Sequence, residues 1–148
     1  MESARKDDPY RLARFLEAQQ ETYASALAEI RSGSKRSHWM WFLFPQIEGL
    51  GHSMAARHYA IKSLEEARAY LEHPVLGPRI VECAEAVPAI RGRTMSEAFG
   101  YPDDLKLRSS MTLFAEAAGG ESVFATVVER CFGGRADERT LELLGRRA

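Results

Sequence analysis

The sequence predicts an all-α fold, a compact multi-helical single domain of about seven to eight helices with no substantial sheet. Over most of the chain, apolar residues recur at intervals of three and four, the spacing of one face of a helix. Helix-capping residues and glycines flank these segments. No segment alternates apolar and polar residues for long enough to predict a half-buried strand. We expect a disordered tail over residues 1–7 and one helical domain over 8–148.

The first predicted helix covers residues 9–31. Leu12, Phe15, Tyr23 and Ile30 belong to its apolar stripe. Asp8 is a good N-cap, and the proline that follows it suits the first helical position, where no N–H is needed. The helix is expected to end before the Ser-Gly-Ser sequence at 32–34.

The next element contains six consecutive large apolar residues, Trp39–Phe44. In a helix, the side chains of Trp39 and Trp41 would point about 200° apart, whereas in a strand they would share a face. Because every other segment has a helical pattern, we expect a short buried helix that starts at Ser37 and ends before Pro45.

The remaining predicted helices follow from their end signals. Ser63 and Thr94 each begin a capping box, with a glutamate three residues later. Asp103 and Asp104 favour a helix start by their charge near the positive end of the dipole. The predicted helices are one from Ser63 to about His73, one over 75–87, one from Thr94 to Gly100, one from Asp103 to about Ala117, one from Val123 to Gly133, and a last one capped by Asp137.

The composition indicates a cytoplasmic protein without a membrane or DNA partner. Lys+Arg (20) and Asp+Glu (21) nearly balance, which argues against a DNA-coating surface. The opening MESARKDD is too polar for a signal peptide, and no apolar run approaches about 20 residues. Cys83 and Cys131 are expected to be buried free thiols, since no metal-ligand spacing surrounds them or the four histidines. We therefore expect no metal and no cofactor.

The stretch HWMWFLFPQIEGLG, from His38 to Gly51, has two interpretations. It is either core plus a loop, or the wall of a ligand pocket. The loop leads into Ser53, a plausible N-cap, and a glycine-bearing loop that enters a helix can expose its amides to an anion.

The stretch PDDLKLRSSMTLF places Asp103, Lys106 and Ser110 on one helical strip, with Ser109 beside them. An ordinary solvated charged face is the simpler interpretation, with Asp104 and Arg108 at the i,i+4 spacing of a surface ion pair. The Ser-Ser-Met-Thr cluster argues for a site, because hydroxyl residues are mediocre helix formers.

A third stretch, Lys35–Trp39, combines basic residues with an aromatic one, a combination that can bind single-stranded nucleic acid. The patch contains only two cations, so this is the weakest of the three hypotheses.

The same motifs resemble those of a bacterial family of uncharacterised proteins, domain-of-unknown-function family 1810, some members of which carry the misnomer calpastatin. The resemblance rests on HWMWFLFPQIEGLG, on Tyr59-Ala-Ile, on His73-Pro-Val-Leu-Gly, on PDDLKLRSSMTLF and on the closing Phe132-Gly with Asp137 and Thr140-Leu. It covers nearly the whole chain and implies a compact helical fold, but no reaction.

The order of elements is also similar to that of the NADAR superfamily, helical proteins linked to ADP-ribose and related N-glycosides. The likeness is one of layout: a methionine-bearing helix over Met111–Phe114, an amphipathic helix over Val123–Cys131 and a short final one. It implies a phosphorylated ribose as ligand.

Together these observations predict a pocket between the 41–53 loop and the 103–112 helix that binds an anionic, nucleotide-sugar-like ligand and hydrolyses an N-glycosidic bond. Trp41 or Phe44 would stack on a ring and Gln46 would hydrogen-bond it. Phosphate would be held by Lys106 and by the amides from Gly49 through Gly51 to Ser53, beside the hydroxyls of Ser109 and Ser110. Asp103 or Asp104 would activate water as a general base, next to Lys106. The alternative is a non-catalytic adaptor that binds a protein or RNA partner through an aromatic surface.

Overall fold

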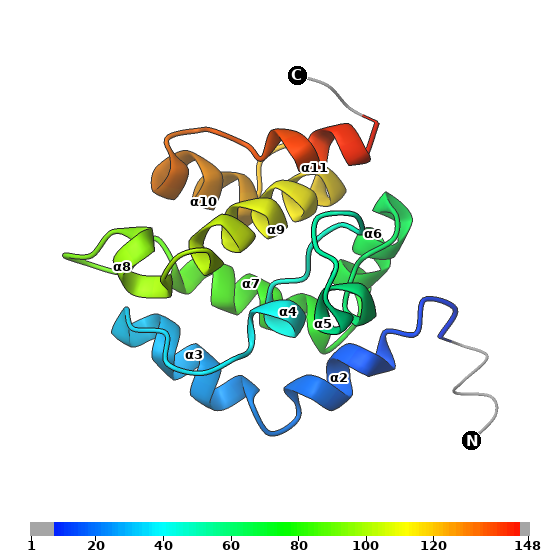
Figure 1. Cartoon of the computed structure of the whole chain (residues 1–148), viewed down its shortest axis with the longest axis horizontal. Coiled ribbons are helices and arrows are strands. Elements are labelled where there is room, and N and C mark those ends of the chain that lie inside the picture. The colour runs from blue at the N-terminus through cyan, green and yellow to red at the C-terminus, as the bar shows by residue number, and fades with distance from the viewer. Residues whose placement is uncertain (1–7, 146–148) are drawn as a thin grey trace.

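The computed structural model describes residues 8–145 and confirms the all-α prediction (Figure 1). The tail predicted over residues 1–7 lies outside this range. In chain order the helices of the described part are α2 (Ala13–Gln19), α3 (Tyr23–Ser32), α4 (Met40–Leu43), α5 (Met54–His58), α6 (Leu64–Glu72), α7 (Leu76–Ala86), α8 (Met95–Phe99), α9 (Asp103–Ala118), α10 (Val123–Phe132) and α11 (Glu138–Leu143). Between residues 8 and 145 the β structure consists of one isolated parallel bridge, Ile47 with Ile61.

The longest helix, α9, is the central element of the fold. It packs against α4, α6, α8, α10 and α11, and Figure 1 shows it between α10 and α11 on one side and the α2–α3 side of the molecule. Because neighbours surround α9, all six residues 109–114 are buried. The Ser109 and Thr112 hydroxyls donate to the backbone carbonyls four residues earlier, which satisfies them inside the helix packing.

The helix predicted over 9–31 is two helices, so this prediction is wrong. α2 ends at Gln19, and α3 begins at Tyr23 after a three-residue turn. The buried Gln19 amide donates to the Phe42 carbonyl oxygen at 2.8 Å and to the Tyr70 hydroxyl at 3.1 Å. These long-range bonds tie the end of α2 to α4 and α6, and a periodicity argument cannot detect them. The split and the single-turn helices raise the number above the seven to eight expected.

The start of the first helix also differs from the prediction. α2 begins at Ala13 rather than at residue 9, after Arg11 in a left-handed conformation with φ 54°. The Asp8 carboxylate accepts hydrogen bonds from the Leu12 and Ala13 N–H groups at 2.7 and 3.0 Å. The predicted N-cap is therefore wrong, since Leu12 occupies that position, although the Asp8 carboxylate still accepts from N–H groups at the start of α2.

The short helix after Ser37 forms, as predicted, over the narrower range of α4. Its two tryptophans diverge. Trp39 is fully buried, and its indole N–H donates to Glu29 Oε1 at 2.8 Å, whereas Trp41 is half-buried and faces the candidate site described below.

The His73–Gly77 sequence makes the tight corner between α6 and α7. The His73 Nδ1 atom accepts hydrogen bonds from the Val75 and Leu76 N–H groups at 3.1 and 3.2 Å. Gly77 allows the two helices to approach closely, because a Cβ atom on it would lie 2.1 Å from the Leu71 carbonyl oxygen. The corner thus depends on the absence of a side chain at Gly77.

We expect Gly77→Ala to destabilise the protein by about 1–3 kcal/mol or more, because the added methyl group must displace the backbone of α6. In an ordinary helix interior the same change stabilises by about 0.5–1 kcal/mol. The sign of the change in urea melts therefore distinguishes the two cases. A more stable variant would show that the helices do not approach closely here.

Candidate functional site

Three charged side chains from two distant segments form a cluster beside α4. The Asp103 carboxylate forms ion pairs with Lys35 Nζ at 2.9 Å and with Lys106 Nζ at 3.3 Å. The side chain of Lys35 is 8% exposed, while those of Asp103 and Lys106 are 21% and 24% exposed. Since two ammonium groups share one carboxylate, the cluster carries a net charge of +1 in a partly desolvated position.

Each lysine of the cluster also lies over a tryptophan. Lys35 Nζ is 5.0 Å from the ring centroid of Trp39, and Lys106 Nζ is 4.0 Å from that of Trp41. Such cation–π contacts stabilise an ammonium group that has lost part of its hydration. The contact between Lys106 and Trp41 brings together the two stretches in which the sequence predicted a site.

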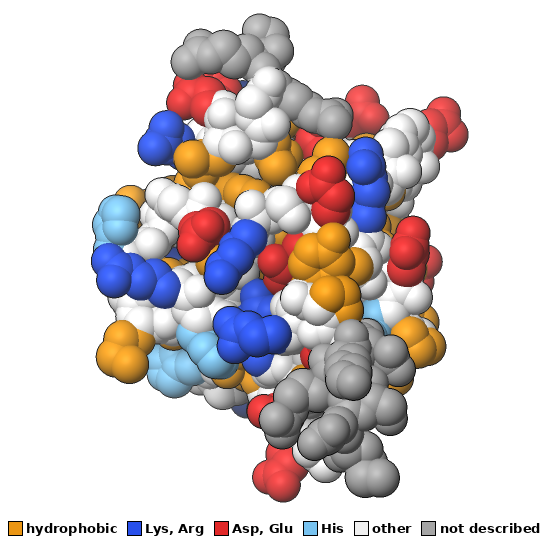
Figure 2. Space-filling view, turned by 90° about the vertical axis from the view of Figure 1, so that its right-hand side faces the viewer, with side chains coloured by type: hydrophobic (Ala, Val, Ile, Leu, Met, Phe, Trp, Pro, Cys, Tyr) orange, Lys and Arg blue, Asp and Glu red, His pale blue; other side chains and the backbone are white. Residues whose placement is uncertain are grey.

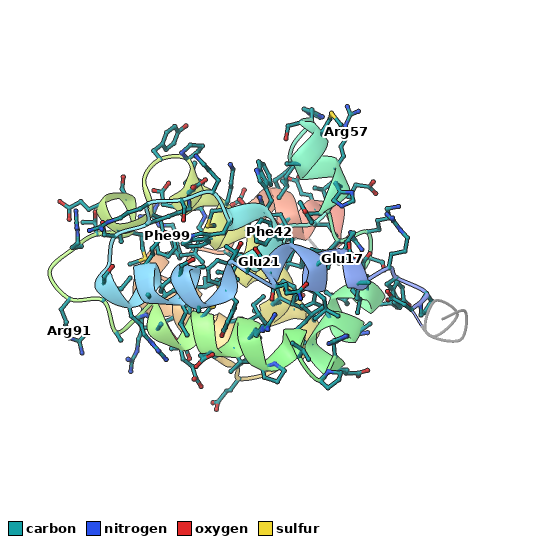
Figure 3. All side chains as sticks on the ribbon, turned by 90° about the horizontal axis from the view of Figure 1, so that it is seen from below. Glu17, Glu21, Phe42, Arg57, Arg91 and Phe99 are labelled. Atoms are coloured by element: carbon teal, nitrogen blue, oxygen red, sulfur yellow. The ribbon has the colours of Figure 1, made fainter. Side chains whose placement is uncertain are left out.

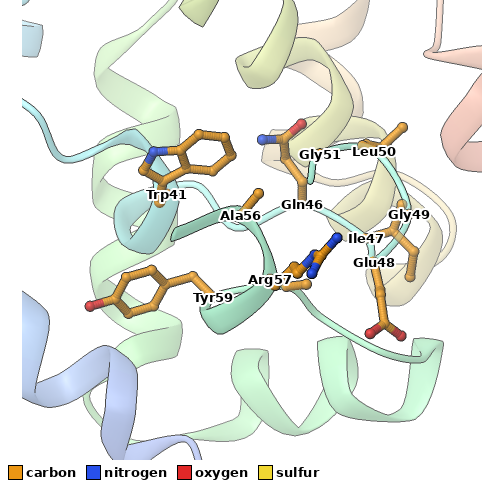
Figure 4. Close-up of a pocket in the computed structure, with 11 residues that line it drawn as sticks. Trp41, Gln46, Ile47, Glu48, Gly49, Leu50, Gly51, Ala56, Arg57 and Tyr59 are labelled. Carbon is orange, nitrogen blue, oxygen red and sulfur yellow. The ribbon is translucent and has the colours of Figure 1, made fainter. Parts of the chain in front are cut away.

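Trp41 also lines a small cavity beside the loop that follows α4 (Figure 4). The volume of the cavity is about 20 Å³, enough for about one water molecule. The residues that line it come from the loop after α4, from α5 and from the segment that follows α5: Trp41, Gln46, Ile47, Glu48, Gly49, Leu50, Gly51, Ala56, Arg57, Tyr59 and Ala60.

Several polar groups around this cavity lack a protein partner. Within the described range, the Gln46 side-chain amide makes no hydrogen bond and Arg57 makes no ion pair. The same holds for the backbone N–H groups of residues 49–53, which donate to no acceptor in residues 8–145. Hydrogen-bonding groups at a cavity wall that are not used by the fold are available to a ligand.

The back wall of the cavity is held by a buried arginine. Arg14 Nε donates to the His58 carbonyl oxygen at 2.7 Å, and Arg14 Nη2 donates to the Ala60 carbonyl oxygen at 2.8 Å. The Nη2 group also forms an ion pair with Glu66 Oε2 at 2.8 Å. The side chains of both Arg14 and Glu66 are more than nine-tenths buried, so this pair fixes the segment after α5 rigidly to α2 and α6.

A second carboxylate, Glu29, organises the loop that carries Lys35. Its oxygens accept from the Arg36 and Ser37 N–H groups, from the Ser37 hydroxyl and from the Trp39 indole N–H. Desolvation raises the pKa of Glu29, but these four hydrogen bonds outweigh it and lower the pKa from its ordinary value of 4.5 to about 2. The ionised form of Glu29 therefore stabilises the loop.

The lowered pKa of Glu29 predicts how stability depends on pH. A depressed folded-state pKa contributes stability that is fully present above about pH 4.5 and is lost as the pH falls toward 2. Glu29→Gln keeps a carbonyl acceptor but no charge, so the difference in unfolding free energy between wild type and variant should shrink over this range. Urea melts at a series of pH values measure it. If the unfolding free energies of wild type and Glu29→Gln differ by the same amount from pH 5 to pH 2, the lowered pKa of Glu29 is contradicted.

The structure places the predicted loop residues in two groups. Trp41, Gln46, Gly49 and Gly51 line the cavity. Phe44, the predicted alternative to Trp41, is fully buried in the core at 6.3 Å from the Trp39 ring, so it cannot stack on a ligand here. Ser53 caps α5, as predicted, and its Oγ accepts from the Ala56 N–H at 3.1 Å.

The predicted residues of α9 are largely engaged with the protein. Asp103 and Lys106 pair with each other, and Asp104 Oδ1 accepts from the Leu105 N–H at 2.9 Å. Ser109 and Ser110 are buried, and Ser110 Oγ has no hydrogen-bond partner in the described part of the chain. Both hydroxyls are therefore enclosed where α9 packs against its neighbours.

The predicted ion pair between Asp104 and Arg108 does not form. Arg108 Nη2 instead lies 3.7 Å from Asp137 Oδ1, where it ties α9 to the start of α11. Asp137 is already fixed there, because its N–H donates to Thr112 Oγ1 at 2.9 Å. The tertiary partner therefore replaces the local one.

The nucleic-acid hypothesis for the Lys35–Trp39 stretch does not agree with the structure. Trp39 is fully buried and the Lys35 ammonium is paired with Asp103, so neither side chain can contact a base or a phosphate. On the face that carries α5 and α6, Figure 2 shows basic, acidic and histidine side chains mixed together, with no continuous basic surface.

Seven of the residues that line the cavity were missed by sequence reasoning, and three of them carry polar side chains. Arg57, Glu48 and Tyr59 all line it, and Arg57 supplies its cation. Glu48 lies inside the quoted motif and Tyr59 follows α5, but nothing in their spacing indicates that they meet. They are brought together by the two hydrogen bonds around the bridge, Glu48 N–H to the Ile61 carbonyl and Ile61 N–H to the Gln46 carbonyl, both 2.8 Å.

The cysteines do not contribute a reactive group to this site. Cys83 is buried, as expected, whereas Cys131 is only half-buried. Desolvation raises the pKa of Cys83 to about 12 and also raises the pKa of Cys131. Both groups are therefore protonated thiols at neutral pH and weak nucleophiles.

Two kinds of feature are absent from residues 8–145. No three His, Cys, Asp or Glu side chains gather in a way that could hold a metal ion. No helix in that range has the length and apolar character needed to cross a membrane.

Comparisons with known proteins agree with the fold. The crystal structure of the conserved hypothetical protein Rv1873 from Mycobacterium tuberculosis matches with a TM-score of 0.91 and 52% sequence identity, over 93% of this chain and 99% of that one. A search of functionally curated proteins gives no match. The family model described as "Protein of unknown function (DUF1810)" matches residues 9–144. Since this match spans nearly the whole sequence, the chain belongs to the DUF1810 family.

Proposed function

We propose that the protein binds a small anionic ligand with a planar ring at the Trp41 cavity. The observation that carries the proposal is the juxtaposition of an aromatic side chain with unused hydrogen-bonding groups and unbalanced positive charge. Trp41 edges the cavity, the Gln46 amide and the N–H groups of residues 49–53 are unbonded within the described chain, and Lys106 lies on the Trp41 ring.

The charges support an anion as the ligand. The Lys35–Asp103–Lys106 cluster has one more cation than anions. At the cavity, Arg57 has no ion-pair partner among residues 8–145, and its charge is balanced by that of Glu48, so the excess positive charge is that of the lysine cluster. Unneutralised cations next to free N–H donors favour phosphate or carboxylate groups. Lys106 is the member of the cluster best placed to reach such a group, since its side chain is three times as exposed as that of Lys35.

The contacts of Asp103 support binding rather than hydrolysis. A general base must be free to accept a proton from water, and Asp103 already pairs with two ammonium groups. Asp104 does not line the cavity; Glu48 is the carboxylate that does. The proposal therefore keeps the anionic, nucleotide-sugar-like ligand and does not include cleavage of an N-glycosidic bond.

A thermal-shift screen tests the proposal with inorganic phosphate, pyrophosphate, AMP, ADP and ADP-ribose, the last chosen for the likeness of layout to the NADAR superfamily. A ligand present at about 100 times its Kd should raise the melting temperature by about 5–10 °C. Lys106→Ala should change the melting temperature of the free protein little but weaken ligand binding about tenfold or more, about 1.4 kcal/mol. Trp41→Ala should reduce both stability and binding.

Arg57→Ala and Arg91→Ala form a matched pair of variants for the same screen. Figure 3 shows Arg57 and Arg91 projecting from opposite ends of the molecule. Of these two arginines, Arg57 lines the cavity and Arg91 does not. Binding that is weakened by Arg57→Ala and unchanged by Arg91→Ala supports the site. A ligand whose affinity depends on neither Lys106 nor Arg57 would show that the anion binds elsewhere.

The adaptor alternative requires an exposed apolar surface. Among residues 8–145 the exposed large apolar side chains are Met54 (89%), Tyr101 (78%), Leu105 (41%), Val75 (38%) and Tyr10 (36%). Isolated exposed apolar residues are common on soluble proteins, and an adaptor surface needs a contiguous patch. The cavity with its unbonded donors is the more specific feature, so we place ligand binding first.

A further inference from the structure

The cavity in the described conformation is too small for the ligand that its chemistry favours. Its volume of about 20 Å³ compares with several hundred Å³ for typical small-molecule sites. One wall must therefore move before a ring can enter. We propose that residues 49–52 form a lid that opens this cavity and closes over the ligand. This inference rests on the proposed function and adds the way in which the site is reached.

The backbone and the aromatic ring on the opposite side of the cavity are fixed. The backbone after α5 is held by the Arg14 side chain through the His58 and Ala60 carbonyl oxygens. The Tyr59 ring packs against those of Phe15 and Phe42, at centroid distances of 5.9 and 5.5 Å. None of these groups can retreat without breaking buried polar or aromatic contacts.

The two ends of the loop are fixed as well. On the near side, residues 46–48 are held by the pair of 2.8 Å hydrogen bonds with Ile61. On the far side, Ser53 caps α5 through its Oγ and its carbonyl oxygen accepts from the Arg57 N–H at 3.0 Å. A movable segment is thus bounded by two anchors only a few residues apart.

Glu48 and Gly49 lie in a turn, and residues 49–52 between these anchors make no hydrogen bond of ordinary length and angle to any group in the described chain. The segment rests instead on apolar contacts. The Gly49 backbone lies against Leu143 of α11, since a Cβ on Gly49 would be 3.2 Å from Leu143 Cδ2, and Gly51 lies against the edge of Trp41. Gly49 has φ +110°, a conformation that glycine adopts freely. Segments without hydrogen bonds open at the lowest free energy in a fold.

The same absence of hydrogen bonds explains how closure would recognise an anion. Gly49, Leu50 and Gly51 of the lid line the cavity, and their unbonded N–H groups would donate to a phosphate or carboxylate once the ring is seated against Trp41. Closure would then replace contacts with water by contacts with the ligand. In the closed position the lid packs against the Leu143 side chain through Gly49.

The test uses the two tryptophans as reporters in protein labelled with 5-fluorotryptophan, without ligand. ¹⁹F NMR should give one signal for Trp41 beside the lid and one for the buried Trp39, assigned with the Trp41→Phe variant. Lid opening on the microsecond-to-millisecond timescale should broaden the Trp41 signal and give it relaxation dispersion, while the Trp39 signal stays sharp.

Leu143→Ala removes the side chain against which the closed lid packs. It should therefore shift the Trp41 signal and change its relaxation dispersion. Leu144→Ala is the matched control, because Leu144 is the adjacent half-buried leucine at the C-cap of α11, whereas the three atoms nearest to a Cβ on Gly49 all belong to Leu143. A Trp41 signal that is sharp in wild type and unchanged by Leu143→Ala overturns the lid, as does an equal effect of both substitutions. This result is independent of the ligand screen: a screen without a hit refutes the proposed function and leaves the lid result standing.

Discussion

Replacing Arg14 with alanine should destabilise the protein by about 3–5 kcal/mol, because it removes the guanidinium group from the buried Glu66 carboxylate and the buried Ala60 carbonyl oxygen. Every N–H-bearing nitrogen of the guanidinium group is used. The five acceptors are the carbonyl oxygens of Tyr10, Arg11, His58 and Ala60 and the carboxylate of Glu66. In thermal melts the loss should lower the melting temperature by at least about 6 °C.

Arg31→Ala is the control for Arg14→Ala. Arg31 pairs with Glu82 at 3.4 Å, but the two side chains are 61% and 46% exposed, so its loss should cost no more than about 1 kcal/mol. Removing Glu66 together with Arg14 should not restore stability, because the His58 and Ala60 carbonyl oxygens would still lack their donor. A change of less than about 1 kcal/mol for Arg14→Ala would mean that water replaces the guanidinium and that the wall after α5 is not held by it.

Phe124→Ala should cost a similar amount, about 3–5 kcal/mol, by opening a cavity between α10 and α9. Phe124 is 3% exposed, and its ring lies 5.8 Å from that of Phe114 at the centre of α9. Phe114 in turn contacts Tyr70 of α6 at 5.3 Å, so the truncation weakens a chain of packed rings through the core.

Glu129→Ala on the same helix provides the comparison for Phe124→Ala, because Glu129 is exposed and alanine keeps the helix propensity. It should change the unfolding free energy by less than about 0.5 kcal/mol. Equal losses in the two variants would indicate that α10 responds to sequence changes generally and that Phe124 has no special place in the core.

The elements that could be predicted from the sequence are those fixed by local chemistry. Ser53, Thr94 and Asp137 cap helices as their positions indicate, and the capping box of Thr94 with Glu97 is complete. Gly133 ends α10 in a left-handed conformation, as a glycine after an apolar stripe predicts. In each case the interacting groups lie within a few residues of one another.

The predictions that failed depended on distant partners. The capping box expected at Ser63 is only half formed, because Glu66 bonds the Lys62 N–H and is drawn to Arg14, 52 residues away. The 9–31 helix breaks where Gln19 bonds the Phe42 carbonyl oxygen. Periodicity describes one face of a helix and contains no information on which distant group will meet it.

The candidate site contains both features that local sequence predicts and features that depend on distant partners. Two stretches with unusual residues were identified separately, and the structure joins them through Lys106 and Trp41. The pairing of Asp103 with Lys35 and the arrival of Arg57 at the cavity could not be predicted, because they depend on how the loops close. The sequence thus indicated the location of the candidate site better than the role of each residue in it.

Titration of 5-fluorotryptophan-labelled protein with the anion panel tests most directly whether the Trp41 cavity is a ligand site. We expect at least one phosphorylated, ring-bearing ligand to shift the Trp41 ¹⁹F signal in a saturable way while the Trp39 signal stays in place. Lys106→Ala should raise the ligand concentration at half-saturation about tenfold, about 1.4 kcal/mol. A panel that moves neither signal, or a ligand that raises the melting temperature and leaves Trp41 unchanged, would contradict a ligand site at Trp41.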